Sequence, residues 1–112
     1  MLPVKFRLTR DKDFKKISAS GKSFFSPLFR VRTLPNNLAH SRFAFIVTTK
    51  TSKKAIVRNR IKRQVREIVR LKHEGANPGY DIVVTIKTTA LNKAYQELEK
   101  DLLKLLAKAK VL

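Results

Sequence analysis

The segment AIVRNRIKRQVREIVR, Ala55 to Arg70, separates apolar from basic side chains with the period of a helix. At about 100° per residue, its apolar side chains fall within an arc of roughly 120°, the width of a helix face that packs on a protein core. They are Val57, Ile61, Val65, Ile68 and Val69. The segment is therefore predicted to be an amphipathic helix with one side in the core.

Arg and Lys make up six of the sixteen residues of this segment, and they lie beside the apolar arc. Glu67 is the one residue of the segment that can pair with them, through Arg63 or Arg70. A face that is merely solvated would mix both signs of charge, so this pattern favours binding to a polyanion. Guanidinium groups can donate paired hydrogen bonds to phosphate, and Asn59 can contact a base or a ribose.

Three lysines, Lys50, Lys53 and Lys54, come just before the helix. The N-terminus of a helix attracts anions through its free N–H groups and its dipole. We therefore expect these lysines to form a phosphate anchor at that end.

The whole chain of 112 residues is expected to be a single domain, residues 1–112. It has 26 Lys and Arg against 8 Asp and Glu, a formal charge of +18. Such self-repulsion implies an anionic partner, with nucleic acid first and an anionic membrane surface second. A hydrophobic fraction of 43% favours a folded domain over a basic disordered tail.

Several kinds of site find no support in the sequence. The chain has no cysteine, which excludes disulfides and metal sites with thiolate ligands. His40 and His73 have no Cys, Asp or second His at the spacing of a metal site or a catalytic dyad, so we expect no catalytic residue and no metal site in the protein. No apolar run approaches the roughly 20 residues that span a bilayer, and we expect a soluble, cytoplasmic protein without a membrane partner.

Hydrophobic periodicity predicts three helices and three strands. We expect the helices at residues 11–19, 55–72 and 92–110, and the strands at residues 29–34, 42–49 and 80–87. Thr9 can cap the first helix, and Gly21 can end it. Asn36-Asn37, after Pro35, predicts a turn that pairs the first two strands as a hairpin. The third strand is apolar on both faces and is expected inside the sheet. The order α-β-β-α-β-α around a small sheet predicts a two-layer α+β sandwich.

The run RNRIKR at residues 58–63, followed by Arg66-Glu67, closely resembles the signature helix of the protein subunit of bacterial ribonuclease P. The resemblance extends over nearly the whole chain. Its flanking matches are Asp13-Phe14, Gly21, Thr49-Lys50 and Gly79-Tyr80-Asp81.

This resemblance implies a function and a set of partners. In that family a catalytic RNA with bound Mg²⁺ cuts precursor tRNA, and the protein belongs to this tRNA 5′-processing endoribonuclease without a nucleophile of its own. The protein docks on the catalytic RNA through the R-N-R helix and its preceding loop, and holds the 5′ leader of precursor tRNA in a cleft between the sheet and the first helix. Mg²⁺ is bound mainly by the RNA, and no obligate protein partner is expected. The family also implies a left-handed crossover between the strands at residues 42–49 and 80–87.

Carried over to this sequence, the family's RNA-docking positions lie on the basic helix and before it. They are Lys50, Lys53, Lys54, Arg58, Asn59, Arg60, Lys62, Arg63 and Arg66. The leader cleft receives Phe14, Arg30 and Arg32.

Two departures from the family pattern concern the leader cleft. Ser18 stands where the family commonly has a second aromatic residue, and Arg30 and Arg32 stand where it often has apolar or aromatic ones. The cleft is thus predicted to hold the leader more through charge. Phe24 and Phe25 are expected in core or hairpin packing.

Three other functions compete with this interpretation. A ribosomal-type structural RNA-binding protein would share the size, charge and fold class. A DNA-binding module would place the basic helix in the major groove, although no partner helix of a helix-turn-helix is recognisable. A membrane-surface role is weaker, because the apolar arc of the basic helix is needed for the core.

Overall fold

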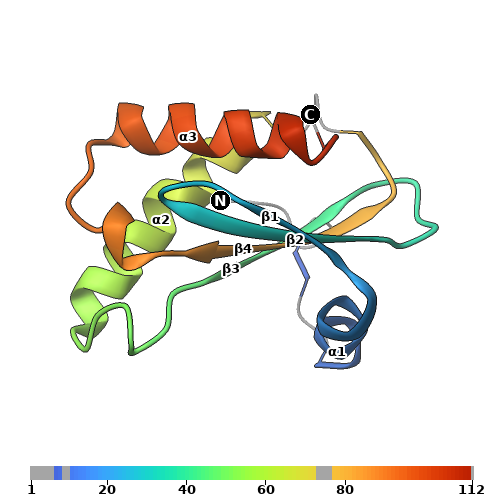
Figure 1. The fold of residues 1–112 in the computed structure, drawn as a ribbon, viewed down its shortest axis with the longest axis horizontal. Helices are drawn as coiled ribbons and strands as arrows, with labels where there is room; N and C mark the ends of the chain where they lie inside the picture. The colour runs from blue at the N-terminus through green and yellow to red at the C-terminus, as the bar shows by residue number, and fades with distance from the viewer. Residues whose placement is uncertain (1–6, 9–10, 73–76, 112) are drawn as a thin grey trace.

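A four-stranded mixed sheet lies at the centre of the computed structural model, which describes residues 7–8, 11–72 and 77–111 (Figure 1). The strands are β1 (Lys22–Phe25), β2 (Phe29–Pro35), β3 (Arg42–Ile46) and β4 (Tyr80–Ile86). Their order across the sheet is β1-β2-β4-β3. The β1–β2 and β2–β4 pairs are antiparallel, whereas β3 and β4 are parallel.

Helices cover both faces of this sheet (Figure 1). They are α1 (Asp11–Ser20), α2 (Ala55–Lys72) and α3 (Tyr95–Lys108), with a short 3₁₀ turn, η3 (Thr88–Ala90). Helices α2 and α3 lie together on one face, and α1 lies on the other. No helix in the described ranges is long and apolar enough to cross a bilayer.

The alternation of side chains along the strands divides the interior into two clusters. On β2, Phe29 and Val31 are fully buried in the larger cluster, under α2 and α3. The apolar face of α2 joins them through Ile61, Val65, Ile68 and Val69, as its period predicts. The smaller cluster, Leu8, Ile17, Ala44 and Val83, lies against α1.

The predicted hairpin between residues 29–34 and 42–49 is wrong. Strands β2 and β3 are not neighbours, because β4 lies between them. The turn does bend the chain: Asn37 has a φ of 59°, and the N–H of Asn36 donates to the carbonyl of Gly79 at 2.8 Å. That bond joins the end of β2 to the start of β4. Because β4 is apolar on both faces, burial is greater when it takes the interior position.

The hairpin in the structure is formed by β1 and β2, and β1 was not predicted. This strand has only four residues, KSFF, and lies at the sheet edge with mostly exposed side chains. So short a segment shows no clear period.

The remaining predictions of architecture concern the fold class, the bounds of α2, the order of the elements and the crossover. The α+β class is confirmed, and α2 has the predicted bounds. The predicted order α-β-β-α-β-α lacks β1, and the predicted two-layer arrangement is wrong, because α1 packs on the face of the sheet opposite α2 and α3. Strands β3 and β4 are parallel and joined through α2, and the left-handed sense of this connection stays a prediction. Thr9 and His73 lie outside the described residues.

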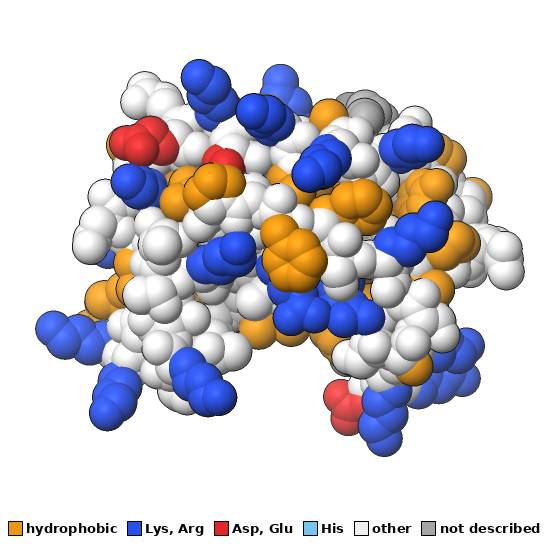
Figure 2. Space-filling model, in the orientation of Figure 1, with side chains coloured by type: hydrophobic (Ala, Val, Ile, Leu, Met, Phe, Trp, Pro, Cys, Tyr) orange, Lys and Arg blue, Asp and Glu red, His pale blue; other side chains and the backbone are white. Residues whose placement is uncertain are grey.

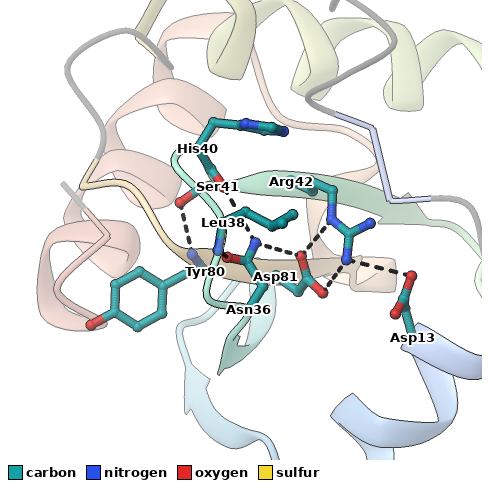
Figure 3. A network of polar contacts seen from close by, with 8 residues as sticks. All are labelled: Asp13, Asn36, Leu38, His40, Ser41, Arg42, Tyr80 and Asp81. Carbon is teal, nitrogen blue, oxygen red and sulfur yellow. Dashed lines mark hydrogen bonds and ion pairs between the residues drawn. The ribbon is translucent and has the colours of Figure 1, made fainter.

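Polar contacts around Asp81 tie α1 to one end of the sheet (Figure 3). Asp81, on β4, is buried and accepts hydrogen bonds from Arg42 Nε at 2.8 Å and Arg42 Nη2 at 2.7 Å. Asn36 Nδ2 donates to the same carboxylate at 2.9 Å. Arg42 Nη2 also lies 3.4 Å from the carboxylate of Asp13, on α1. The hydrogen bonds to Asp81 raise the pKa of Arg42 above its ordinary value, and one guanidinium thereby joins β3, β4 and α1.

We predict that Arg42→Ala lowers the free energy of unfolding by about 3 kcal/mol, because it leaves the buried carboxylate of Asp81 without its cation. Urea unfolding measures this change. Arg42→Lys should recover only part of the loss, since an ammonium cannot donate the paired hydrogen bonds of a guanidinium. An unchanged unfolding midpoint in Arg42→Ala would show that the network adds nothing to stability.

Candidate nucleic-acid interface

The outer side of α2 carries a row of basic side chains. Asn59, Arg60 and Arg63 are exposed, while Lys62 and Arg66 are half-buried along their length. Ile56, which is 82% exposed, lies on the same side. A shallow hollow of about 440 Å³ runs between Ile56, Asn59, Lys62, Arg63 and Arg66.

Little of this charge is neutralised by the carboxylates that the structure describes. Arg70 pairs with Glu67, with Arg70 Nη2 2.6 Å from Glu67 Oε1, and the hydrogen bond from Arg70 lowers the pKa of Glu67. Within the described part of the chain, no carboxylate forms an ion pair with Arg60, Lys62, Arg63 or Arg66. Cations held on one face without counterions form an electrostatic surface for phosphate.

Arg58 differs from the other basic residues of α2. Its side chain is half-buried, and Nη1 donates to the carbonyl of Ser52 at 2.8 Å. Arg58 was predicted to be an RNA-docking residue. The structure gives it a second role, because it holds the loop before α2 against the first turn of the helix.

The loop before α2 is fixed by its own hydrogen bonds. Thr51 N donates to Thr48 O at 3.0 Å, and Lys54 N donates to Ser52 Oγ at 3.2 Å. Lys50, Lys53 and Lys54 are exposed on this loop, and the first turn of α2 has no acidic residue. The three lysines thus lie on the loop that leads into the N-terminus of α2, and their role as a phosphate anchor stays a prediction.

The predicted leader cleft lies on the face of the sheet that α1 covers in part. Phe14, on α1, is half-buried and packs on the smaller apolar cluster. Arg30 and Arg32 extend from β2 toward this face, opposite in direction to the buried Phe29 and Val31.

The two arginines have different environments. Arg32 Nη2 donates to the carbonyls of Ser18 at 2.9 Å and Gly21 at 3.3 Å, at the end of α1. The last turn of α1 contains no basic residue, so Arg32 supplies the cation that its dipole favours there. Arg30 instead lies over the ring of Phe25, with its Cζ 5.7 Å from the ring centroid.

Gly21 makes room for this junction. A Cβ atom at residue 21 would lie 2.5 Å from the backbone oxygen of Ile17, so a larger residue would force α1 and β1 apart. The glycine thereby lets β1 begin directly after α1 and keeps Arg32 within reach of the helix end.

The surface seen in Figure 2 is basic and hollowed at its lower edge. The hollow lies between two projections that carry Lys and Arg side chains. By the arrangement in Figure 1, one is α1 and the other is the loop with the start of α2. The surface is thus suited to a bound polyanion between them.

Known proteins share both the sequence and the fold. The ribonuclease P family model matches residues 2–110. This chain belongs to the ribonuclease P protein family. A ribonuclease P protein component from Pseudanabaena sp. is 42% identical over 113 residues, a match that covers 100% of this chain and 97% of the relative.

Solved structures of the family have the same fold. A Staphylococcus aureus RNase P protein mutant with defective mRNA degradation activity matches with a TM-score of 0.90 at 28% identity, over 96% of this chain and 91% of that one. The RNase P protein from Thermotoga maritima matches with a TM-score of 0.84 at 33% identity, over 91% of this chain and 96% of that one. The chain is accordingly the protein component of a bacterial tRNA-processing ribonucleoprotein and has an RNA partner.

Sequence reasoning did not identify two residues on the face of the sheet that carries the predicted leader cleft (the leader face), Phe25 and Lys87. Phe24 packs partly buried against the larger cluster, as expected, whereas Phe25 points to the opposite face and is exposed. Lys87 Nζ lies 5.7 Å from the centroid of the Phe25 ring. The alternation of Phe24 and Phe25 would have shown this, had β1 been recognised as a strand.

We predict that Arg60→Ala weakens binding to the RNA subunit but leaves the urea unfolding midpoint unchanged, because this side chain is exposed and has no ion pair with a described carboxylate. The slope of log affinity against log salt concentration should fall by about one for each phosphate that the variant no longer neutralises. Arg58→Ala should lower both RNA affinity and stability, since it also releases Ser52. Equal losses of stability in the two variants would contradict this assignment.

Proposed function

We propose that this ribonuclease P protein binds the catalytic RNA through α2 and its preceding loop, and the 5′ leader of precursor tRNA on the sheet face beside α1. It would thereby promote removal of the leader during tRNA 5′ maturation, in the cytoplasm. The observation that carries the proposal is the row of cations on α2 that no described carboxylate neutralises.

The two surfaces suit two different RNA segments. The outer side of α2 is a helix face with guanidinium and ammonium groups, which suits the phosphates of a folded RNA. The sheet face beside α1 combines a half-buried ring, Phe14, with the cations of β2. A ring and neighbouring cations suit a single strand, whose bases stack while its phosphates are neutralised.

The protein's contribution is electrostatic. Two RNA molecules that approach each other repel, and a chain with a formal charge of +18 placed between them screens that repulsion. Because Arg30 and Arg32 place two cations on this face of the sheet, leader affinity should fall steeply with salt.

Mg²⁺ is proposed to be bound mainly by the RNA. In the described residues, no group of three or more His, Cys, Asp or Glu side chains lies together in a way that could hold a metal ion. When bound, Mg²⁺ activates water and stabilises the charge of the leaving oxygen. The protein's residues position the RNA on which that chemistry occurs.

Reconstitution tests this proposal. We predict that wild-type protein accelerates precursor-tRNA cleavage by the catalytic RNA at low Mg²⁺. A variant with Arg60→Gln, Lys62→Gln and Arg63→Gln should lose most of that acceleration, because three cations that bind phosphates are removed from the face of α2.

A control variant with Lys100→Gln, Lys104→Gln and Lys108→Gln removes the same charge from exposed positions of α3. It should keep the acceleration. If wild-type protein gives no acceleration, the proposal is wrong; if both variants lose it equally, total charge matters and the face of α2 does not.

A further inference from the structure

Phe25 is an aromatic side chain that belongs to neither of the two apolar clusters. It is 57% exposed, while its neighbour Phe24 packs against the larger cluster from the other face of β1. In the β1–β2 ladder Phe25 lies directly across from Arg30, and cross-strand partners point to the same face of a sheet. Phe25 therefore stands on the leader face.

Two cations converge on this ring. Arg30 Cζ and Lys87 Nζ each lie 5.7 Å from its centroid. Lys87 Nζ is held there by a 2.7 Å hydrogen bond to the carbonyl of Ser26. Arg30 Nε is buried and has no hydrogen-bond partner among the described residues. The attraction of each cation to the ring is offset by repulsion between two like charges.

The described carboxylates do not relieve that repulsion. Neither Arg30 nor Lys87 forms an ion pair with any of them. Asp101 is bound to Ser26 Oγ and to the N–H of Leu28. The two cations beside the exposed ring therefore have no described carboxylate as counterion. A nucleotide would supply what both parts of the site can bind, a phosphate for the cations and a flat base for the ring.

We propose that Phe25, Arg30 and Lys87 form a binding site for one unpaired nucleotide of the leader, in which the base stacks on the ring and the phosphate binds the two cations. The inference rests on the proposed function of the leader face. Arg30 already belongs to the predicted leader cleft, and the inference adds Phe25 and Lys87 to it as the ring and the second cation of a separate nucleotide site.

This site would be selective for single strands and tolerant of base identity. Every base has a face that can stack on an aromatic ring, but a paired base in a duplex does not expose it. The phosphate contacts likewise carry no sequence information. The site therefore lengthens the stretch of leader that the protein holds without restricting its sequence.

Equilibrium binding of the reconstituted holoenzyme to precursor tRNA and to mature tRNA tests the site. Phe25→Ala should weaken precursor binding by about 5-fold to 150-fold, the loss expected when one base no longer stacks. Mature tRNA, which has no leader, should bind unchanged. Phe25→Trp should retain wild-type affinity, whereas Phe25→Leu, which keeps apolar bulk but has no ring, should behave like Phe25→Ala.

Leu38→Ala is the matched control, because Leu38 is another exposed apolar side chain, 42% accessible, outside this face. It should leave both affinities unchanged. Lys87→Gln should weaken precursor binding and lower the slope of its salt dependence by about one, since one cation no longer meets the phosphate.

Different outcomes separate this inference from the proposed function. If the wild-type holoenzyme binds precursor and mature tRNA equally, the protein does not hold the leader and the proposed function fails with the site. If wild type prefers the precursor and Phe25→Ala keeps that preference, only the nucleotide site is wrong. Full retention by Phe25→Leu, or an equal loss for mature tRNA, would also overturn it.

Discussion

Strand β4 is apolar on both faces, and the arrangement of the other elements follows from that constraint. Ile82, Val84 and Ile86 are buried under α2 and α3, while Val83 is buried in the smaller cluster against α1. Such a strand must lie inside the sheet and be covered on each side. Two helices cover one side, and the single short helix α1 covers the other only in part, since Phe25 on that face remains exposed. The open part of the sheet is thus a consequence of how the core is built.

Some of the chain's few carboxylates form ion pairs within the protein, either between elements or inside one helix. Asp13 and Asp81 share Arg42, which fastens α1 to two strands, and Glu67 takes Arg70 at the last turns of α2. With 8 acidic residues against 26 basic ones, the protein has too few carboxylates to pair with most of its cations. The ones left without ion pairs in the described ranges include those on the outer side of α2. Some cations thus stabilise the fold, while the cations on the outer side of α2 remain available for the proposed RNA binding.

Arg32 and Arg58 stabilise the fold in addition to the RNA contacts that the sequence predicts for them. Each donates hydrogen bonds to backbone carbonyls, Arg32 at the end of α1 and Arg58 in the loop before α2. They hold the two projections that flank the hollow in Figure 2, α1 on one side and the loop on the other. These bonds help to set the shape of the basic surface, and the cations without ion pairs in the described ranges give it its charge.

The sequence by itself determined the helices, the interior strand and the basic face of α2, because each depends on a period within one continuous segment. The bounds of α2 and the burial of Ile61, Val65, Ile68 and Val69 were all available from that local pattern. Only the tertiary structure decided which strands pair. The local pattern of β2 and β3 is compatible with a hairpin, but β4 lies between them in the sheet. The tertiary structure also decided that Arg58 and Arg32 bind carbonyls and that Phe25 meets Arg30 and Lys87, because those neighbours come from distant segments that only the folded sheet brings together.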